Sequence, residues 1–388
     1  MFGLLFLLLP VAVAYGWYMG QRSVRQQRKR KSNQLSRQYV AGLNLLLSDQ
    51  SDKAVDLFID LLQVDSDTIE THLALGNLFR QRGEVDRAIR IHQNLIARPS
   101  LDVEQRQLAL LQLSKDYQVA GLFDRAETIL LELTNEPEHS ENALKSLLFL
   151  YQQTREWRKA IGIGEQIPSQ WIANIQTQIA HFYCELALEE ETSGNFKRVQ
   201  GYLRKALHHD SRCVRARLHL AQFLVEQQHY KEAVRWIEEL PEIDVDLLSD
   251  YVPLIEQIYE GLQDENSFRE YLERAMRLGA GASVTLKLAS LIEHDNIGAA
   301  QRMVLDELKR RPTMRGFHKL IDYHVQQAEP GQARQSLQAL RDLVARQMLI
   351  RPRYRCQKCG FSSHAMYWHC PSCKSWGTVK PVRGLDGE

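Results

Sequence analysis

The residues best suited to chemistry in this chain are four cysteines in the stretch CQKCGFSSHAMYWHCPSC. They form two Cys-x-x-Cys pairs, Cys356 with Cys359 and Cys370 with Cys373, separated by ten residues. This spacing allows both sulfurs of a pair to face one ion, and the glycine after the first pair, Gly360, or the proline within the second, Pro371, favours the tight turn that this requires. Because four thiolates close a tetrahedral site around one ion, we predict a structural metal centre.

The metal itself is predicted from the gap between the pairs. The motif resembles rubredoxin, in which four cysteines hold one iron for electron transfer, and also the shorter rubredoxin-like zinc ribbon. The ten-residue gap is shorter than in electron-carrying rubredoxins, and Lys374 stands where those proteins usually have glycine. We therefore expect zinc, with iron as the alternative, and interpret His364 and His369 as non-ligands.

Basic and aromatic residues interleave around the cysteines. We interpret Tyr367, Trp368 and Trp376 as candidates for a partner-binding surface. Two alternatives stay open: RNA binding, because basic and aromatic side chains together bind single strands, and docking of the ribbon against the rest of the chain. The basic residues of this segment are Arg351, Arg353, Arg355, Lys358, Lys374, Lys380 and Arg383.

Composition limits the classes of function. The 388 residues carry a net charge of +1, which gives no global reason to expect nucleic-acid binding. The other two cysteines, Cys184 and Cys213, stand alone in helical patterns and are interpreted as buried thiols. Such an uneven distribution indicates a metal site in a reducing compartment rather than a disulfide scaffold. No nucleophile–base pair or paired-carboxylate signature is present, so we predict that the protein is not an enzyme.

Residues 35–340 show helical periodicity with a repeat of about 34 residues. Gly42 and Gly76 are 34 residues apart, and so are Ala54 and Ala88; Ala126 follows after a short insertion, and later copies are looser. The pattern resembles the tetratricopeptide repeat, in which two amphipathic helices form each unit. Stacked units bury a continuous core and make a right-handed superhelix, whose concave face suits extended peptides or partner helices. We therefore predict an all-α, superhelical solenoid of about nine units.

The N-terminal stretch MFGLLFLLLPVAVAYGWYMG has no charged residue and is long enough to span a bilayer as a helix. A signal peptide is the competing interpretation, but its positive charge would precede the apolar run, and here the charge follows it. The positive-inside rule then places the rest of the chain in the cytoplasm. The residues that predict this topology are Arg22, Arg25, Arg28, Lys29, Arg30 and Lys31.

The order of the parts resembles the lipopolysaccharide assembly protein B family of Gram-negative bacteria. The predicted segments are an anchor (1–20), a basic linker (21–34), the repeat solenoid (35–349) and a rubredoxin-like metal-binding domain (350–388). The resemblance implies a single-pass inner-membrane adaptor that restrains lipopolysaccharide synthesis. It would promote proteolysis of the deacetylase LpxC by the protease FtsH, under control of the regulator YejM (PbgA). We expect no nucleic-acid partner and leave a homo-oligomer open; a membrane-tethered electron carrier or RNA-binding regulator is the alternative.

Overall fold

The computed structural model describes residues 17, 19, 21, 40–42, 44–45, 53–54, 57, 69–99 and 101–388. Its chain contacts divide it into an N-terminal unit, residues 1–156, and a C-terminal unit, residues 157–388. Most of the predicted anchor and all six residues of the basic flank lie outside the described residues. Within the described part of the chain, no helix combines the length and the apolar character needed to cross a membrane.

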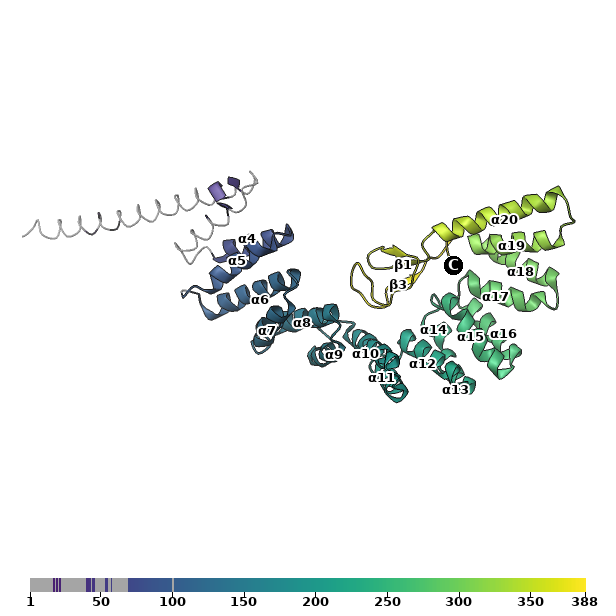
Figure 1. Cartoon of the computed structure of the whole chain (residues 1–388), viewed down its shortest axis with the longest axis horizontal. Coiled ribbons are helices and arrows are strands. Elements are labelled where there is room, and N and C mark those ends of the chain that lie inside the picture. The colour runs from purple at the N-terminus through teal and green to yellow at the C-terminus, as the bar shows by residue number, and fades with distance from the viewer. Residues whose placement is uncertain are drawn as a thin grey trace, which may run out of the picture. The chain divides into compact units, whose positions relative to one another are not determined.

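The N-terminal unit consists of antiparallel helical hairpins (Figure 1). Helices α4 and α5 form one hairpin and α6 and α7 the next, followed by α8. The small first-helix residue predicted from the repeat has a direct packing role: a Cβ on Gly76 would lie 2.4 Å from the His92 ring of α5. The helices are α4 (Ile69–Gln81), α5 (Val85–Ile96), α6 (Val103–Val119), α7 (Phe123–Leu133) and α8 (Ser140–Thr154).

The C-terminal unit continues the same architecture and ends in the cysteine-rich segment. Its helices are α9 (Trp157–Gln166), α10 (Ile175–Thr192), α11 (Phe196–His209), α12 (Val214–Glu226), α13 (Tyr230–Ile237), α14 (Leu240–Ile243), α15 (Leu248–Leu262), α16 (Glu265–Arg277), α17 (Ala282–Glu293), α18 (Ile297–Arg310), α19 (Met314–Gln327) and α20 (Gln332–Ile350). The single-turn helix α14 lies in the connection between α13 and α15. The fold is a mostly helical, tetratricopeptide-like solenoid with a small terminal sheet.

The repeat period has a simple packing cause. In the second helix of most hairpins the fourth residue points into the core, and a small side chain there lets neighbouring helices approach closely. Ala88, Ala126, Ala160, Ala233 and Ala300 occupy this position in α5, α7, α9, α13 and α18, and each is fully buried. The predicted alanine positions are therefore confirmed as core positions.

The turns inside the hairpins share a backbone feature that the sequence shows only in part. A left-handed residue lies two positions before the second helix in several hairpins. Glycine fills it at Gly83, Gly121 and Gly194, but glutamine does so at Gln228 and Gln263. The absence of glycine in the last two hid these turns from the sequence pattern, because glycine is the usual residue at this conformation.

The cysteine-rich segment, which we call the ribbon (residues 351–388), contains a three-stranded antiparallel sheet in the order β2-β1-β3. Its strands are β1 (Tyr354–Cys356), β2 (Ser362–Ser363) and β3 (Val379–Pro381). Tyr354 pairs with Ser363 on one side and with Pro381 on the other. Strands this short bury little apolar surface, so the ribbon needs other sources of stability.

Candidate metal centre and its docking surface

The four predicted cysteines are brought together at one point of the ribbon. Their Sγ atoms all lie within 4.8 Å of one another. The Sγ atoms of Cys356 and Cys373 are 3.7 Å apart, as are those of Cys359 and Cys370. A tetrahedral ion with metal–sulfur bonds of about 2.3 Å separates its sulfurs by about 3.8 Å. The thiols therefore fit a four-coordinate metal ion, and the protein contains a four-cysteine metal-binding ribbon.

Hydrogen bonds prepare one thiol of the site for ionisation. Burial disfavours the thiolate of Cys356, but the Thr378 hydroxyl, 3.3 Å away, and the backbone N–H groups of Lys358 and Cys359 donate to its sulfur. These bonds outweigh burial and lower the pKa of Cys356 to about 6. Burial instead raises the pKa of Cys370 to about 11. A cation between the thiols would overcome that cost, because a coordinated thiol is deprotonated.

Each Cys-x-x-Cys pair ends in the same turn. The N–H of Gly360 donates to the Cys356 carbonyl at 2.9 Å, and the N–H of Lys374 donates to the Cys370 carbonyl at 3.0 Å. Both residues are left-handed, with φ of 78° at Gly360 and 57° at Lys374. The substitution of lysine for the usual glycine therefore strains the second turn while preserving its shape. His369 donates from Nε2 to the Lys374 carbonyl, away from the sulfurs.

Replacement of Lys374 by glycine is expected to stabilise the metal centre by about 0.5–1 kcal/mol, because the left-handed strain is removed. Metal removal by a chelator, followed at equilibrium, measures the effect. Gly360→Ala is the matched control and should weaken the site, since an added Cβ there has open space but an unfavourable φ. Easier metal removal from Lys374→Gly would contradict the strain argument.

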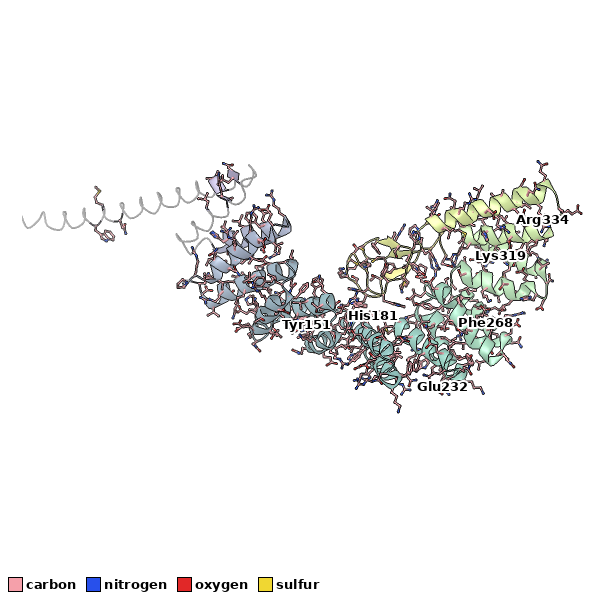
Figure 2. All side chains as sticks on the ribbon, in the orientation of Figure 1. Tyr151, His181, Glu232, Phe268, Lys319 and Arg334 are labelled. Carbon is pink, nitrogen blue, oxygen red and sulfur yellow. The ribbon has the colours of Figure 1, made fainter. Side chains whose placement is uncertain are left out.

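One ribbon side chain, Trp376, is inserted between helices of the C-terminal unit. It is 9% exposed and stacks on His181 with ring centroids 5.0 Å apart. The rings of Trp157 and Phe182 meet it edge-on at 6.1 and 5.8 Å. His369 stacks on the indole at 4.4 Å. The helices α9 and α10 thus form an aromatic slot for this one tryptophan, and Figure 2 labels His181 on α10.

This arrangement corrects the prediction that Tyr367, Trp368 and Trp376 form a partner-binding surface. Trp376 is buried inside the chain and offers no surface to a partner. Trp368 is half-buried, with the Arg215 guanidinium over its ring at 6.0 Å and the His181 ring at 6.1 Å. Only Tyr367, 40% exposed, stays available. For Trp368 and Trp376 the alternative interpretation, docking of the ribbon against the helices, is the correct one. Their large apolar rings gain most from burial.

Charged side chains of the ribbon continue the docking surface. Lys380 pairs with Asp244 and Arg383 with Asp246, both in the segment between α14 and α15. Arg353 lies 3.4 Å from a carboxylate oxygen of Asp250. Arg351 lies 2.6 Å from a carboxylate oxygen of Asp386 within the ribbon. The basic residues that suggested RNA binding thus include four with internal carboxylate partners, which lowers their value for binding phosphates.

The segment after β3 reaches the beginnings of two more helices. The Glu388 carboxylate accepts hydrogen bonds from the backbone N–H and the hydroxyl of Ser283, at 2.9 and 2.8 Å, and pairs with Arg315. Near it, the N–H of Met314 donates to the Leu385 carbonyl at 2.8 Å. A carboxylate is favoured at a helix N-terminus, so Glu388 stabilises the start of α17. Through the contacts of this docking surface, the ribbon touches α9, α10, α12, α15, α17 and α19.

Acid is expected to weaken this docking through His181. Burial, followed by the charges of Arg215, His369 and Lys380, lowers the pKa of His181 to about 3. The pKa of histidine in the unfolded chain is about 6.5. The stabilisation of the folded state by neutral His181 is therefore complete above that pH, and it declines as pH falls toward the folded pKa, by about 2 kcal/mol at pH 5. Between pH 7.5 and 5.5, the free energy of unfolding should therefore fall less steeply in His181→Phe than in the wild-type protein. Identical slopes would contradict this role of His181.

Several residues of this surface escaped the sequence analysis. No motif in the sequence marks Trp157, His181 or Glu388 as part of such a surface. The detectable signal was charge complementarity, since Asp244, Asp246 and Asp250 recur at short intervals and the ribbon is basic. The prediction that Cys184 and Cys213 are buried is confirmed.

Known proteins share both parts of this architecture. Residues 354–381 match the family described as the rubredoxin metal binding domain. Residues 71–107 and 192–258 match tetratricopeptide repeat families. Among solved structures, a MamA crystal structure is 22% identical, covers 46% of this chain and 93% of its own, and has a TM-score of 0.31.

Two curated relatives align with almost every residue. Lipopolysaccharide assembly protein B of Escherichia coli strain K12 is 48% identical over 388 residues, which cover 100% of both chains. The protein of the same name from Haemophilus influenzae is 42% identical and the alignment covers 98% of both. With such identity over the full length, this chain belongs to the lipopolysaccharide assembly protein B family.

Proposed function

We propose that the protein is a non-enzymatic adaptor in lipopolysaccharide assembly. The name that the full-length relatives share, lipopolysaccharide assembly protein B, supports a role in lipopolysaccharide assembly. The observation that best supports an adaptor is the docked ribbon. It connects the first helices of successive hairpins through Trp376, the acidic residues Asp244 and Asp246, and Glu388. A metal-stabilised part that braces a repeat array suits recognition of other proteins.

Zinc is the metal proposed for the ribbon. Cys356, Cys359, Cys370 and Cys373 would hold it, and four protein ligands leave no open position for a substrate, which is the arrangement of a structural site. The ion would supply folding energy rather than chemistry. Metal analysis of aerobically purified protein tests this assignment. A red, iron-loaded protein with a reversible one-electron potential would favour the electron carrier instead.

The mechanism proposed is proximity at the inner membrane. Residues 1–20 would anchor the chain with its bulk in the cytoplasm, as the charges from Arg22 to Lys31 predict. The anchor would meet FtsH or its regulator YejM (PbgA) within the bilayer, while the helical units and the ribbon would capture LpxC. Holding protease and substrate in one membrane plane raises their effective concentration without new chemistry.

The test compares the full chain with a chain lacking residues 1–20, each produced at native abundance in cells without the chromosomal copy. The half-life of LpxC should be short with the full chain and several-fold longer with the truncated chain. A truncated chain that restored full turnover would show that tethering is irrelevant. In-cell crosslinking from Tyr367 and from exposed α6 residues such as Leu108 should capture LpxC or FtsH. Recovery of RNA instead would favour the RNA-binding regulator.

A further inference from the structure

The helix that ends the repeat array, α20, has an unusual surface. Among the described residues, it carries four strongly exposed large apolar side chains: Leu340 (48%), Leu343 (57%), Leu349 (79%) and Ile350 (69%). None of its residues is buried. The last helix of a solenoid normally presents a polar outer face, because no further repeat covers it. Clustered apolar side chains in such a position indicate an interaction site.

The two faces of α20 differ in kind. Leu337, Val344 and Met348 are half-buried on the face that packs against α19, which is the neighbour of α20 in this hairpin. The opposite, exposed face carries residues spaced four, three, four and three positions apart, a period of 3.5. We call these residues the α20 seam: Ser336, Leu340, Leu343, Gln347 and Ile350.

The seam favours another helix as its occupant. A period of 3.5 keeps one face toward a partner helix along its whole length. The seam contains no charged residue, whereas a helix that lies on a lipid surface carries lysine or arginine along the edges of its apolar face. Of the charges nearest the seam, Asp342 is already beside Arg341 at 3.1 Å, and Arg346 is exposed. The edge of the seam that Asp342 and Arg346 form therefore carries both a negative and a positive charge.

We propose that α20 pairs in antiparallel orientation with α20 of a second copy of this chain. Leu343 would lie on the two-fold axis, with Leu340 opposite Gln347 of the second copy. Arg346 would then lie about 3 Å along the helix axis from Asp342 of the second copy, since a helix rises about 1.5 Å per residue. The edge is thus complementary to itself, as an isologous interface requires. The buried glutamine would fix the register.

The expected dimer is weak in dilute solution. A typical stable interface buries about 800 Å² per partner, and one helix pair with three large apolar seam residues buries less. We expect a dissociation constant on the order of 1–100 μM. This inference does not depend on the proposed adaptor function, because association of copies can be measured without LpxC or the protease.

The experiment uses the full chain in detergent micelles and measures its oligomeric state by sedimentation over protein concentration. Leu343→Arg places two cations at the axis and should weaken association at least tenfold. Val119→Arg, at a 59% exposed valine of α6, is the matched control and should leave association unchanged. Arg346→Asp should also weaken it, and the double variant Asp342→Arg/Arg346→Asp should restore it, because the charges are then exchanged on both copies.

A second measurement locates the contact. Leu343→Cys should yield a homodimer with a short bismaleimide in native membranes, whereas Val119→Cys should not. Helical circular dichroism and metal content establish that each variant is folded. The proposal is overturned if the wild-type chain stays monomeric at 100 μM or if Leu343→Cys crosslinks only to other proteins.

Discussion

Cys356→Ser is expected to lose the metal and unfold the ribbon, with bound metal falling from one ion per chain to nearly none. A structural zinc ion contributes on the order of 10–16 kcal/mol to domains of this kind, and three short strands cannot replace it. Hydrogen exchange should report the change directly. The N–H of Cys356, bonded to the Phe361 carbonyl at 2.8 Å, and the N–H of Gln357, bonded to the Thr378 carbonyl at 2.8 Å, should lose protection.

The structure also predicts where this effect stops. The start of α17 should lose protection with the ribbon, because it loses the Glu388 carboxylate. Helices α4 to α8 should keep theirs, since they belong to the other compact unit. His364→Ala is the matched control, and we expect it to retain the metal because His364 is not among the clustered ligands. A serine variant that kept one ion per chain, or lost protection throughout α4 to α8, would contradict this account.

Trp376→Ala is expected to detach the ribbon from the helices while the metal stays bound. Truncation of a buried tryptophan costs about 3–5 kcal/mol, and this indole contacts the rings of Trp157, His181 and Phe182. The cysteines do not depend on those contacts, so metal content should be unchanged. Limited proteolysis should then cut between α20 and β1, and protection of α10 should fall.

Two control variants test whether the effect of Trp376→Ala comes from the loss of the buried indole. Trp376→Phe keeps an aromatic ring in the slot and should cost clearly less than the alanine variant. Tyr367→Ala removes an aromatic residue of the same ribbon that is exposed, so its effect on stability should be below about 0.5 kcal/mol. If Trp376→Ala released the metal as readily as Cys356→Ser, docking and metal binding would be one cooperative event rather than two.

Local features of the sequence predicted the parts of this protein well. The spacing of a Cys-x-x-Cys pair is set within one turn, and the burial of Ala88 and Ala126 follows from the helical period. Neither feature requires knowledge of distant residues. The all-helical array and the clustered thiols were therefore predictable, whereas the left-handed turns at Gln228 and Gln263 were not, because glutamine carries no signal for that conformation.

Residue spacing alone establishes that this chain has a helical repeat array and a four-cysteine metal site. How the two are joined depends on tertiary packing. Lys380 and Asp244 are 136 residues apart, and Ser283 and Glu388 are 105 apart. An aromatic or charged residue in a sequence indicates what it can bind but not which surface it meets, because that depends on packing across many intervening residues. For this reason Trp376 was predicted to face a partner and instead lies inside the protein's own aromatic slot.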